Sequence, residues 1–212
     1  MPNYQTVNAL FAAQEGLATR SQLLALGVPA STIRYRERPQ GPWRRVLKCT
    51  TSNRSGPLTR WQRLCAALLF AGPGALVTGF AALWAYRIGL GTGLGVRVLI
   101  PHARRLKSDG FVVVTRTTRL PPAVILGRCA LAPPARAAVD ACLRTRSIEV
   151  VRTVVAAVVR NRLCTPAELA RELEAHQVQY SARLRNVLSR GQLRHARPIL
   201  RAPALLPRPT VQ

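Results

Sequence analysis

Residues 19–47, TRSQLLALGVPASTIRYRERPQGPWRRVL, decide the fold of the first part of this chain. Thr19 is typical of a residue that caps a helix, because its hydroxyl can accept a hydrogen bond from the first turn, and Gly27 is typical of a residue that ends one. After a short turn, a further helix is predicted at residues 30–38, and Ile33 is expected to anchor it to the leucines of the preceding helix. We expect the leucines of the preceding helix to face inward: Leu23, Leu24 and Leu26.

The residues on either side complete a small DNA-binding fold. Residues 4–14 have the apolar spacing of a short amphipathic helix. The turn RPQGP at 38–42 is followed by WRRVLKC at 43–49, which can run as a strand. Three helices and a short hairpin in about the first 50 residues predict a winged helix-turn-helix, whose last helix enters the major groove of DNA.

The charge of the chain favours a polyanionic partner. The 212 residues include 32 basic and 8 acidic ones, which gives a net charge of +24. Such an excess attracts nucleic acid first and an anionic membrane surface second. Only two of the basic residues are lysines. This arginine bias indicates a GC-rich genome, so part of the charge reflects composition alone. The charge is nevertheless focused, because six of the eight basic residues in 1–57 lie between Arg34 and Lys48.

A recognition helix must present slim hydrogen-bonding residues and arginines to the bases. Ser31 and Thr32 suit its first turn, while Arg34 and Arg38, four residues apart, share one face. Arg36 points elsewhere, and we expect it to meet the DNA backbone. In a winged fold, the residues after the turn lie along phosphates or in a minor groove. The candidate DNA-binding residues are Ser31, Thr32, Arg34, Tyr35, Arg36, Arg38, Trp43, Arg44 and Arg45.

From residue 58 the sequence predicts a second, mixed module. Thr59 and Thr165 are candidate helix caps, and helices are predicted at 60–71, 80–86, 132–144, 147–162 and 165–176. Strands are predicted at 96–101 and 110–117, joined by a basic loop. The expected fold class is therefore α+β and mostly helical. It comprises a winged helix-turn-helix at 1–55, a small α/β module at 56–188 and a disordered Arg/Pro-rich tail at 189–212.

Residues 65–86 form an uncharged run of 22 residues, which is long enough to span a bilayer. The AGPG at 71–74 interrupts this run, and alanine and glycine contribute little to membrane insertion. Two short buried helices around a turn therefore fit better. No signal peptide is expected, because the N-terminus lacks a basic start followed by an apolar run. The five cysteines form no CxxC pair, which indicates free thiols in a reducing cytoplasm.

Catalytic residues are not recognisable in the sequence. Asp109 is expected in a turn, and Asp140, inside a predicted helix, is a candidate partner for a nearby arginine. The glycine-rich GLGTGLG at 89–95 lacks the Lys-Ser/Thr ending of a P-loop and precedes a strand, so it is expected to be a linker. We expect no enzyme activity, no metal, no cofactor and no small-molecule substrate.

Three segments of the chain resemble one protein family. They are LFAAQEGLATRSQLLALGVPASTIRYRERPQGPWRRVL (10–47), TRWQRLCAALLFAGPGALVTGFAALW (59–84) and LAPPARAAVDACLRTRS (131–147). They resemble actinobacterial relatives of the AbiEi antitoxins of type IV toxin–antitoxin systems, over roughly residues 5–188. The resemblance implies a winged helix-turn-helix that binds promoter DNA for autoregulation, an α/β antitoxin-like module and a cognate toxin partner. The DNA contacts that it implies are Ser31, Thr32, Arg34, Tyr35, Arg38, Arg44 and Arg45.

The chain departs from this family in several places. Pro29 stands where relatives often have a capping serine, and VLKCTTS at 46–52 replaces the usual end of the wing, which indicates a short or irregular wing. Many relatives continue into an endonuclease domain similar to the mismatch-repair nuclease Vsr, which needs carboxylates to hold Mg²⁺. No acidic residue follows Glu174. A truncated nuclease-family remnant, with a tail read out of frame, is one hypothesis for this end of the chain.

Two further functions remain open from the sequence. One is a protein-interaction module of a toxin–antitoxin system, in which the arginines cover a solvated or protein-docking face and read no DNA. The other is a membrane-associated protein anchored by residues 65–86.

Overall fold

The computed structural model describes residues 4–90, 93, 95–176 and 181–189. They form a mixed α+β fold with more helix than strand, which confirms the expected class. The described residues group into two compact units. The first is drawn from Met1–Leu76, Leu94–Thr118 and Gly127–Cys129, and the second from Val77–Gly93, Arg119–Leu126 and Ala130–Gln212. The predicted tail lies outside the described residues, apart from Ser189, and so do three residues of the predicted linker at 89–95.

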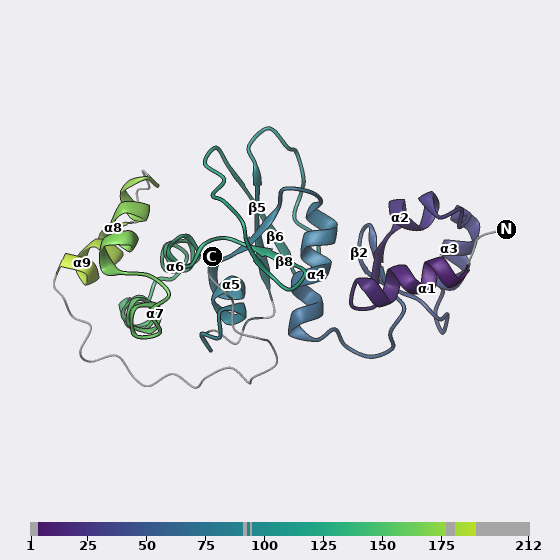
Figure 1. Ribbon diagram of the computed structural model, residues 1–212, viewed down its shortest axis with the longest axis horizontal. Helices are drawn as coiled ribbons and strands as arrows, with labels where there is room; N and C mark the ends of the chain where they lie inside the picture. Colours follow the sequence, from purple (N-terminus) through teal and green to yellow (C-terminus); the bar gives the residue numbers. More distant parts are fainter. Residues whose placement is uncertain (1–3, 91–92, 94, 177–180, 190–212) are drawn as a thin grey trace. The chain divides into compact units, whose positions relative to one another are not determined.

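The first part of the chain runs α1 (Tyr4–Ala13), β1 (Leu17–Thr19), α2 (Arg20–Ala25), α3 (Ala30–Arg36), β2 (Arg44–Leu47) and β3 (Thr50–Ser52). Figure 1 shows α1, α2 and α3 as neighbouring short helices. The strands form an antiparallel sheet in the order β1-β3-β2. β1, which precedes α2 in the chain, therefore pairs with β3, the second strand of the β2–β3 hairpin. The hairpin is short and its register shifts between Arg45 and Leu47.

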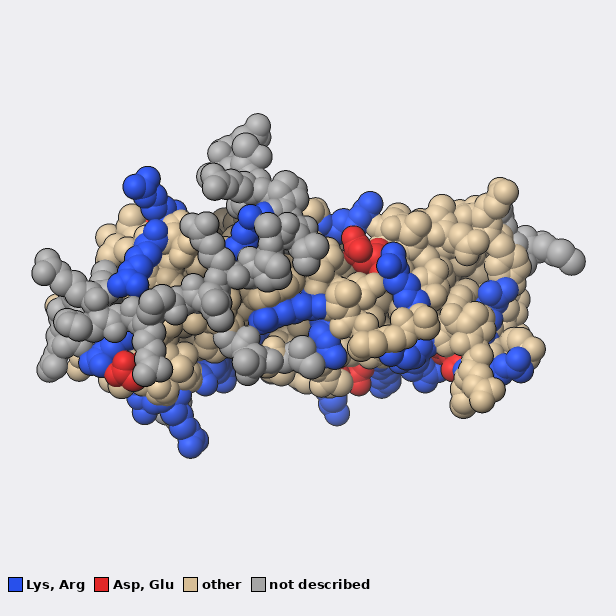
Figure 2. Space-filling model, turned by 90° about the horizontal axis from the view of Figure 1, so that it is seen from below, with Lys and Arg blue, Asp and Glu red and all other residues tan. Residues whose placement is uncertain are grey.

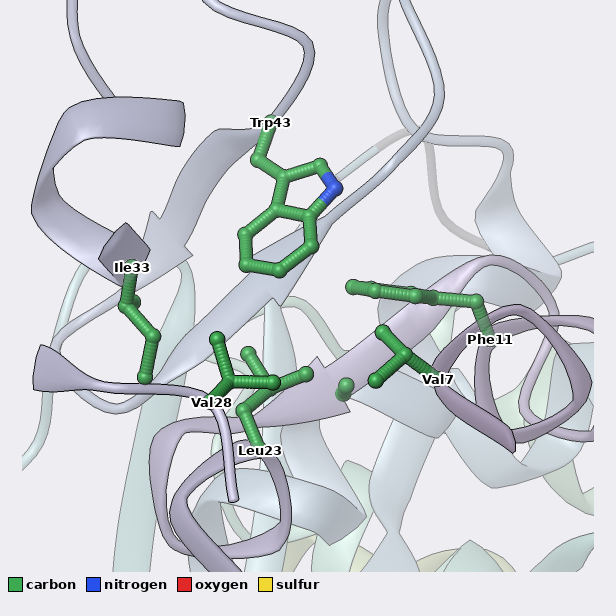
Figure 3. Packing of buried hydrophobic residues seen from close by; sticks show 7 residues of the cluster. Val7, Phe11, Leu23, Val28, Ile33 and Trp43 are labelled. Carbon is green, nitrogen blue, oxygen red and sulfur yellow. The ribbon is translucent and has the colours of Figure 1, made fainter. Parts of the chain in front are cut away.

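These helices share one apolar core (Figure 3). It consists of buried residues from all three helices and their connections: Val7, Phe11, Ala18, Leu23, Val28, Ile33 and Trp43. The rings of Phe11 and Trp43 meet at a tilt, with their centroids 5.3 Å apart. Burial of Ile33 beside Leu23 confirms the predicted anchor of α3. Leu24 was expected to face inward, but its side chain is 45% exposed, because the 100° step per residue of an α-helix turns it away from Leu23.

Local capping chemistry sets where the helices begin. Thr19, Thr59 and Thr165 each accept a hydrogen bond from the backbone N–H three residues on, and the side chain at that position accepts one from the backbone N–H of the threonine. These reciprocal pairs are capping boxes, which confirms the predicted helix starts. The helix predicted at 30–38 ends earlier, at Arg36, because the backbone N–H of Trp43 bonds to the Arg36 carbonyl and turns the chain back.

The uncharged run at 65–86 folds as predicted into two helices around a turn. They are α4 (Arg60–Ala71) and α5 (Gly79–Ala85), with the three-residue strand β4 (Leu76–Thr78) between them. In the part of the chain that the structure describes, no helix is both long and apolar enough to cross a bilayer. The predicted strands are β5 (Val96–Pro101) and β6 (Val112–Thr117), which pair in parallel in register Val96↔Val112.

Two further strands, β7 (Val124–Leu126) and β8 (Cys129–Leu131), complete a sheet of order β6-β5-β4-β8-β7. The chain then continues through α6 (Pro134–Cys142), α7 (Ile148–Arg160), α8 (Pro166–Glu174) and α9 (Ala182–Ser189). α6 packs against α5, α7 and α8, and α9 packs against α7 and α8. Figure 1 shows α6 to α9 gathered into one group of helices.

Candidate nucleic-acid interface

The exposed face of α3 carries several of the predicted contact residues. Ser31, Arg34 and Tyr35 are exposed, with 60% of the Tyr35 side chain open to solvent, while Thr32 is half-buried. Ile33, between Thr32 and Arg34, is fully buried. The short helix therefore has an apolar side that fixes it to the core and an opposite side that offers a hydroxyl, a phenol and a guanidinium to a partner.

Arg38 lies beyond the end of α3 but still belongs to this face. Its guanidinium stacks over the Tyr35 ring, 3.9 Å from the ring centroid. Such cation–π contacts contribute about 0.5–1 kcal/mol at exposed sites, and this one holds the Arg38 guanidinium against α3. Arg38 was predicted to share a helical face with Arg34, but α3 ends at Arg36, and a stacking contact with Tyr35 places Arg38 instead.

Arg36 and Trp43 have a different role from the predicted one. The Trp43 side chain is only 6% exposed and packs in the core, so it cannot lie along phosphates. The Arg36 guanidinium lies over the Trp43 ring at 5.1 Å and over the Tyr4 ring at 4.6 Å. Both residues therefore tie α1 to the α3–β2 connection, and Trp43 is a core residue and not a contact residue.

The β2–β3 hairpin brings two more predicted arginines beside α3. Arg44 and Arg45 are exposed at the start of β2. Arg45 donates from Nε and Nη2 to Glu37 Oε2, at 3.2 and 2.8 Å, and Glu37 also accepts from the Thr51 hydroxyl. At the other end of the hairpin, the backbone N–H of Lys48 donates to Asp109 Oδ2 at 2.7 Å, so Asp109 does more than form the turn predicted for it.

A hollow of about 710 Å³ lies between the α3–β2 connection and the end of β3. Its lining combines residues 37–45 with Asn53, Arg54 and Ser55. These last three are not among the predicted contact residues, because they follow the hairpin and lie outside the helix, turn and first strand on which that prediction rests. Four arginines and a single carboxylate line the hollow, so its net charge favours an anion.

The surface as a whole is strongly basic. Figure 2 shows Lys and Arg side chains across the face that it draws, with few acidic ones between them. This distribution agrees with the compositional origin of part of the charge, and it means that charge alone does not select one face. What distinguishes the α3–hairpin surface is the combination of arginines with an exposed aromatic ring, exposed hydroxyls and a hollow.

A second cluster of charged residues lies in the second unit, where it joins three elements. Asp140 on α6 accepts from the Thr78 hydroxyl at 2.6 Å, from Arg136 Nε at 3.0 Å and from His176 Nε2 at 3.1 Å. Glu172 on α8 lies 3.5 Å from both Arg136 Nη1 and His176 Nδ1. The cluster ties β4, α6 and the end of α8 together. It confirms the predicted partnership of Asp140 with a nearby arginine.

Burial is the largest single influence on each pKa in this cluster, and hydrogen bonds and neighbouring charges together oppose it. Burial alone raises the pKa of Asp140, but the bond with His176 and the charge of Arg136 outweigh it and hold that pKa below its usual value. Burial likewise raises the pKa of Glu172, and bonds with His176 and Arg119 lower it further than burial raises it. Burial lowers the pKa of His176, yet its bonds with Asp140 and Glu172 leave it raised overall. The described residues contain no group of His, Cys, Asp and Glu that could hold a metal.

Comparison with known proteins identifies a shared fold. No protein-family model matches the chain, and no curated protein matches it. Among solved structures, the crystal structure of the RV2827C protein from Mycobacterium tuberculosis is similar, with a TM-score of 0.54 and 18% sequence identity. The match covers 88% of this chain and 76% of that one. At this identity, the similarity establishes a common fold for most of the chain.

Proposed function

We propose that residues 4–52 form a winged helix-turn-helix that binds double-stranded DNA. The order of elements supports this, since α2 and α3 are joined by a short turn and followed by the β2–β3 hairpin, to which β1 adds a third strand. In this arrangement α3 is the recognition helix and the hairpin is the wing.

One observation carries the proposal. Ile33 is fully buried while its neighbours Ser31, Arg34 and Tyr35 are exposed, so α3 is fixed to the core by one side and presents DNA-reading chemistry on the other. Arginine reads guanine through paired hydrogen bonds, and serine can bond to bases or phosphates. The proposed contact residues are Ser31, Thr32, Arg34, Tyr35, Arg38, Arg44 and Arg45.

The contacts divide into two kinds. Arg34 and the Tyr35–Arg38 stack lie on or next to α3, where base edges are reached, and they are proposed to select the sequence. Arg44 and Arg45 flank the hollow and are proposed to hold phosphates, which fixes the position of the protein on the duplex without selecting bases. Arg36 packs on the ring of Trp43 and is not a proposed contact residue.

The resemblance to AbiEi-like antitoxins extends the proposal. It suggests a transcriptional regulator that represses its own promoter and acts as the antitoxin of a cognate toxin. The proposal includes no catalytic step.

A gel-shift measurement with DNA from upstream of the gene tests this function. Wild-type protein should retard this duplex at concentrations that leave a scrambled duplex free. Arg34→Ala should lose this preference, whereas Arg146→Ala, which removes the same charge from an exposed position in the second unit, should retain it. If Arg34→Ala binds like the wild type, the protein-interaction alternative replaces DNA reading.

A further inference from the structure

Glu37 is an unusual residue on this surface. It is the single acidic residue between Gly16 and Ser108, in a stretch rich in arginine. Its side chain is only 6% exposed, and it immediately follows α3 as the C-cap residue. A buried carboxylate opposes the binding of an anion, so its presence beneath a DNA-binding surface calls for a compensating role.

The contacts of Glu37 define that role. One carboxylate oxygen accepts from Thr51 of β3, which is itself buried, and the other accepts two N–H groups from Arg45 of β2. Arg45 and Thr51 stand opposite each other in the hairpin. Glu37 thus fixes the end of α3 to both strands of the hairpin and accepts three hydrogen bonds in doing so.

The geometry leaves Arg45 available to a partner. Its guanidinium uses the edge formed by Nε and Nη2 on Glu37, while 57% of the side chain remains exposed. The opposite edge, formed by Nη1 and the second N–H of Nη2, can donate two parallel hydrogen bonds to a phosphate. A long side chain that is already held in place loses less conformational freedom when it binds.

We propose that Glu37 is a positioning residue, which holds Arg45 so that its free edge meets a DNA phosphate beside the recognition helix. This inference rests on the proposed DNA-binding function. It makes Arg45 a bridge between a buried carboxylate and the DNA backbone. The fixed distance between this phosphate contact and α3 then sets the register in which α3 lies on the bases.

A double-mutant cycle on DNA affinity tests the coupling of these two residues. In the wild-type background, Arg45→Ala should weaken binding to the upstream duplex about tenfold, and in the Glu37→Gln background by less than about twofold. In the Glu15→Gln background, which changes the net charge equally at a residue outside the hydrogen bonds that join Glu37, Thr51 and Arg45, the loss should again be about tenfold. Circular dichroism verifies that each variant is folded.

A second variant tests the bridge without altering Glu37. Lysine offers a point charge and lacks the fork that can bond to two acceptors along separate edges. Arg45→Lys should therefore weaken binding nearly as much as Arg45→Ala. In both variants the slope of log affinity against log salt concentration should become shallower by the amount that corresponds to about one lost phosphate contact.

The outcomes separate the two proposals. If the wild type shows no binding to the duplex, DNA binding and the positioning role both fail. If the wild type binds but Arg45→Ala costs as much or more in the Glu37→Gln background, Glu37 competes with DNA for Arg45, and only the positioning role is overturned. Wild-type DNA affinity of Arg45→Lys would also overturn the positioning role of Glu37.

Discussion

Replacing Asp140 by alanine should destabilise the second unit strongly. Asp140 makes hydrogen bonds to Thr78, Arg136 and His176, and the Arg136 side chain that it neutralises is only 5% exposed. After the substitution, Arg136 retains Glu172 at 3.5 Å and the Arg119 carbonyl at 3.2 Å, but its closest ionic partner is gone.

Two routes lead to the same magnitude. Breaking a buried ion pair by removing one partner costs about 3–5 kcal/mol. Counting the three lost hydrogen bonds at about 1–1.5 kcal/mol each gives about 3–4.5 kcal/mol. A loss near 4 kcal/mol corresponds to a fall in Tm of about 10 °C for a chain of this size.

Urea unfolding followed by circular dichroism measures this loss. The midpoint should shift to lower urea with little change in the slope, because the surface exposed on unfolding is nearly the same. Glu174→Ala, which removes an exposed carboxylate of α8, is the matched control and should change the free energy of unfolding by less than about 0.5 kcal/mol. A loss below about 1 kcal/mol for Asp140→Ala would refute the view that this cluster holds α6, α8 and β4 together.

Three further predictions concern the cluster and the candidate interface. The raised pKa of His176 means that its contribution to stability is complete below its ordinary value of 6.5 and is lost as pH rises through the folded-state pKa. The lowered pKa of Asp140 means that its contribution to stability is complete above the ordinary value of 3.8 and is lost as pH falls through its depressed value. Urea unfolding measured across pH should show a fall in the free energy of unfolding on the alkaline side, which comes from His176 and which His176→Gln lacks. Trp43→Ala should lower the free energy of unfolding by about 3–5 kcal/mol, because it leaves a cavity beside Phe11, and it should abolish DNA binding through unfolding. Trp43→Phe should keep both the fold and DNA binding, as thermal unfolding and gel shift will reveal. Tyr35→Ala should leave the Tm unchanged within about 2 °C and weaken DNA binding, since the ring is 60% exposed; a large fall in Tm would contradict its assignment to the interface.

The sequence predicted those parts of the fold that depend on neighbouring residues. Thr19, Thr59 and Thr165 start helices by bonding within the first turn, so the pattern of residues three apart was sufficient to find them. The three-residue strands β1 and β4 were missed, because each is buried along its whole length and shows no alternation of apolar and polar residues.

The candidate interface was predicted in part for the same reason. The sequence assigned Ile33 to the core and Arg34 to the exposed surface of α3, and both lie there. It could not show that Trp43 folds back onto Phe11, since that contact joins residues far apart in the chain. The bond between His176 and Asp140 likewise joins residues 36 apart, and the sequence could not predict it because no histidine has a motif partner near it in the chain.

The ratio of affinities for the upstream duplex and a scrambled duplex tests the central claim most directly. Fluorescence anisotropy at physiological salt should give a ratio of about 1,000 or more for the wild type, and Arg34→Ala should reduce it at least about tenfold while Arg146→Ala leaves it intact. Equal affinity of the wild type for both duplexes, or equal effects of the two substitutions, would contradict sequence reading by α3.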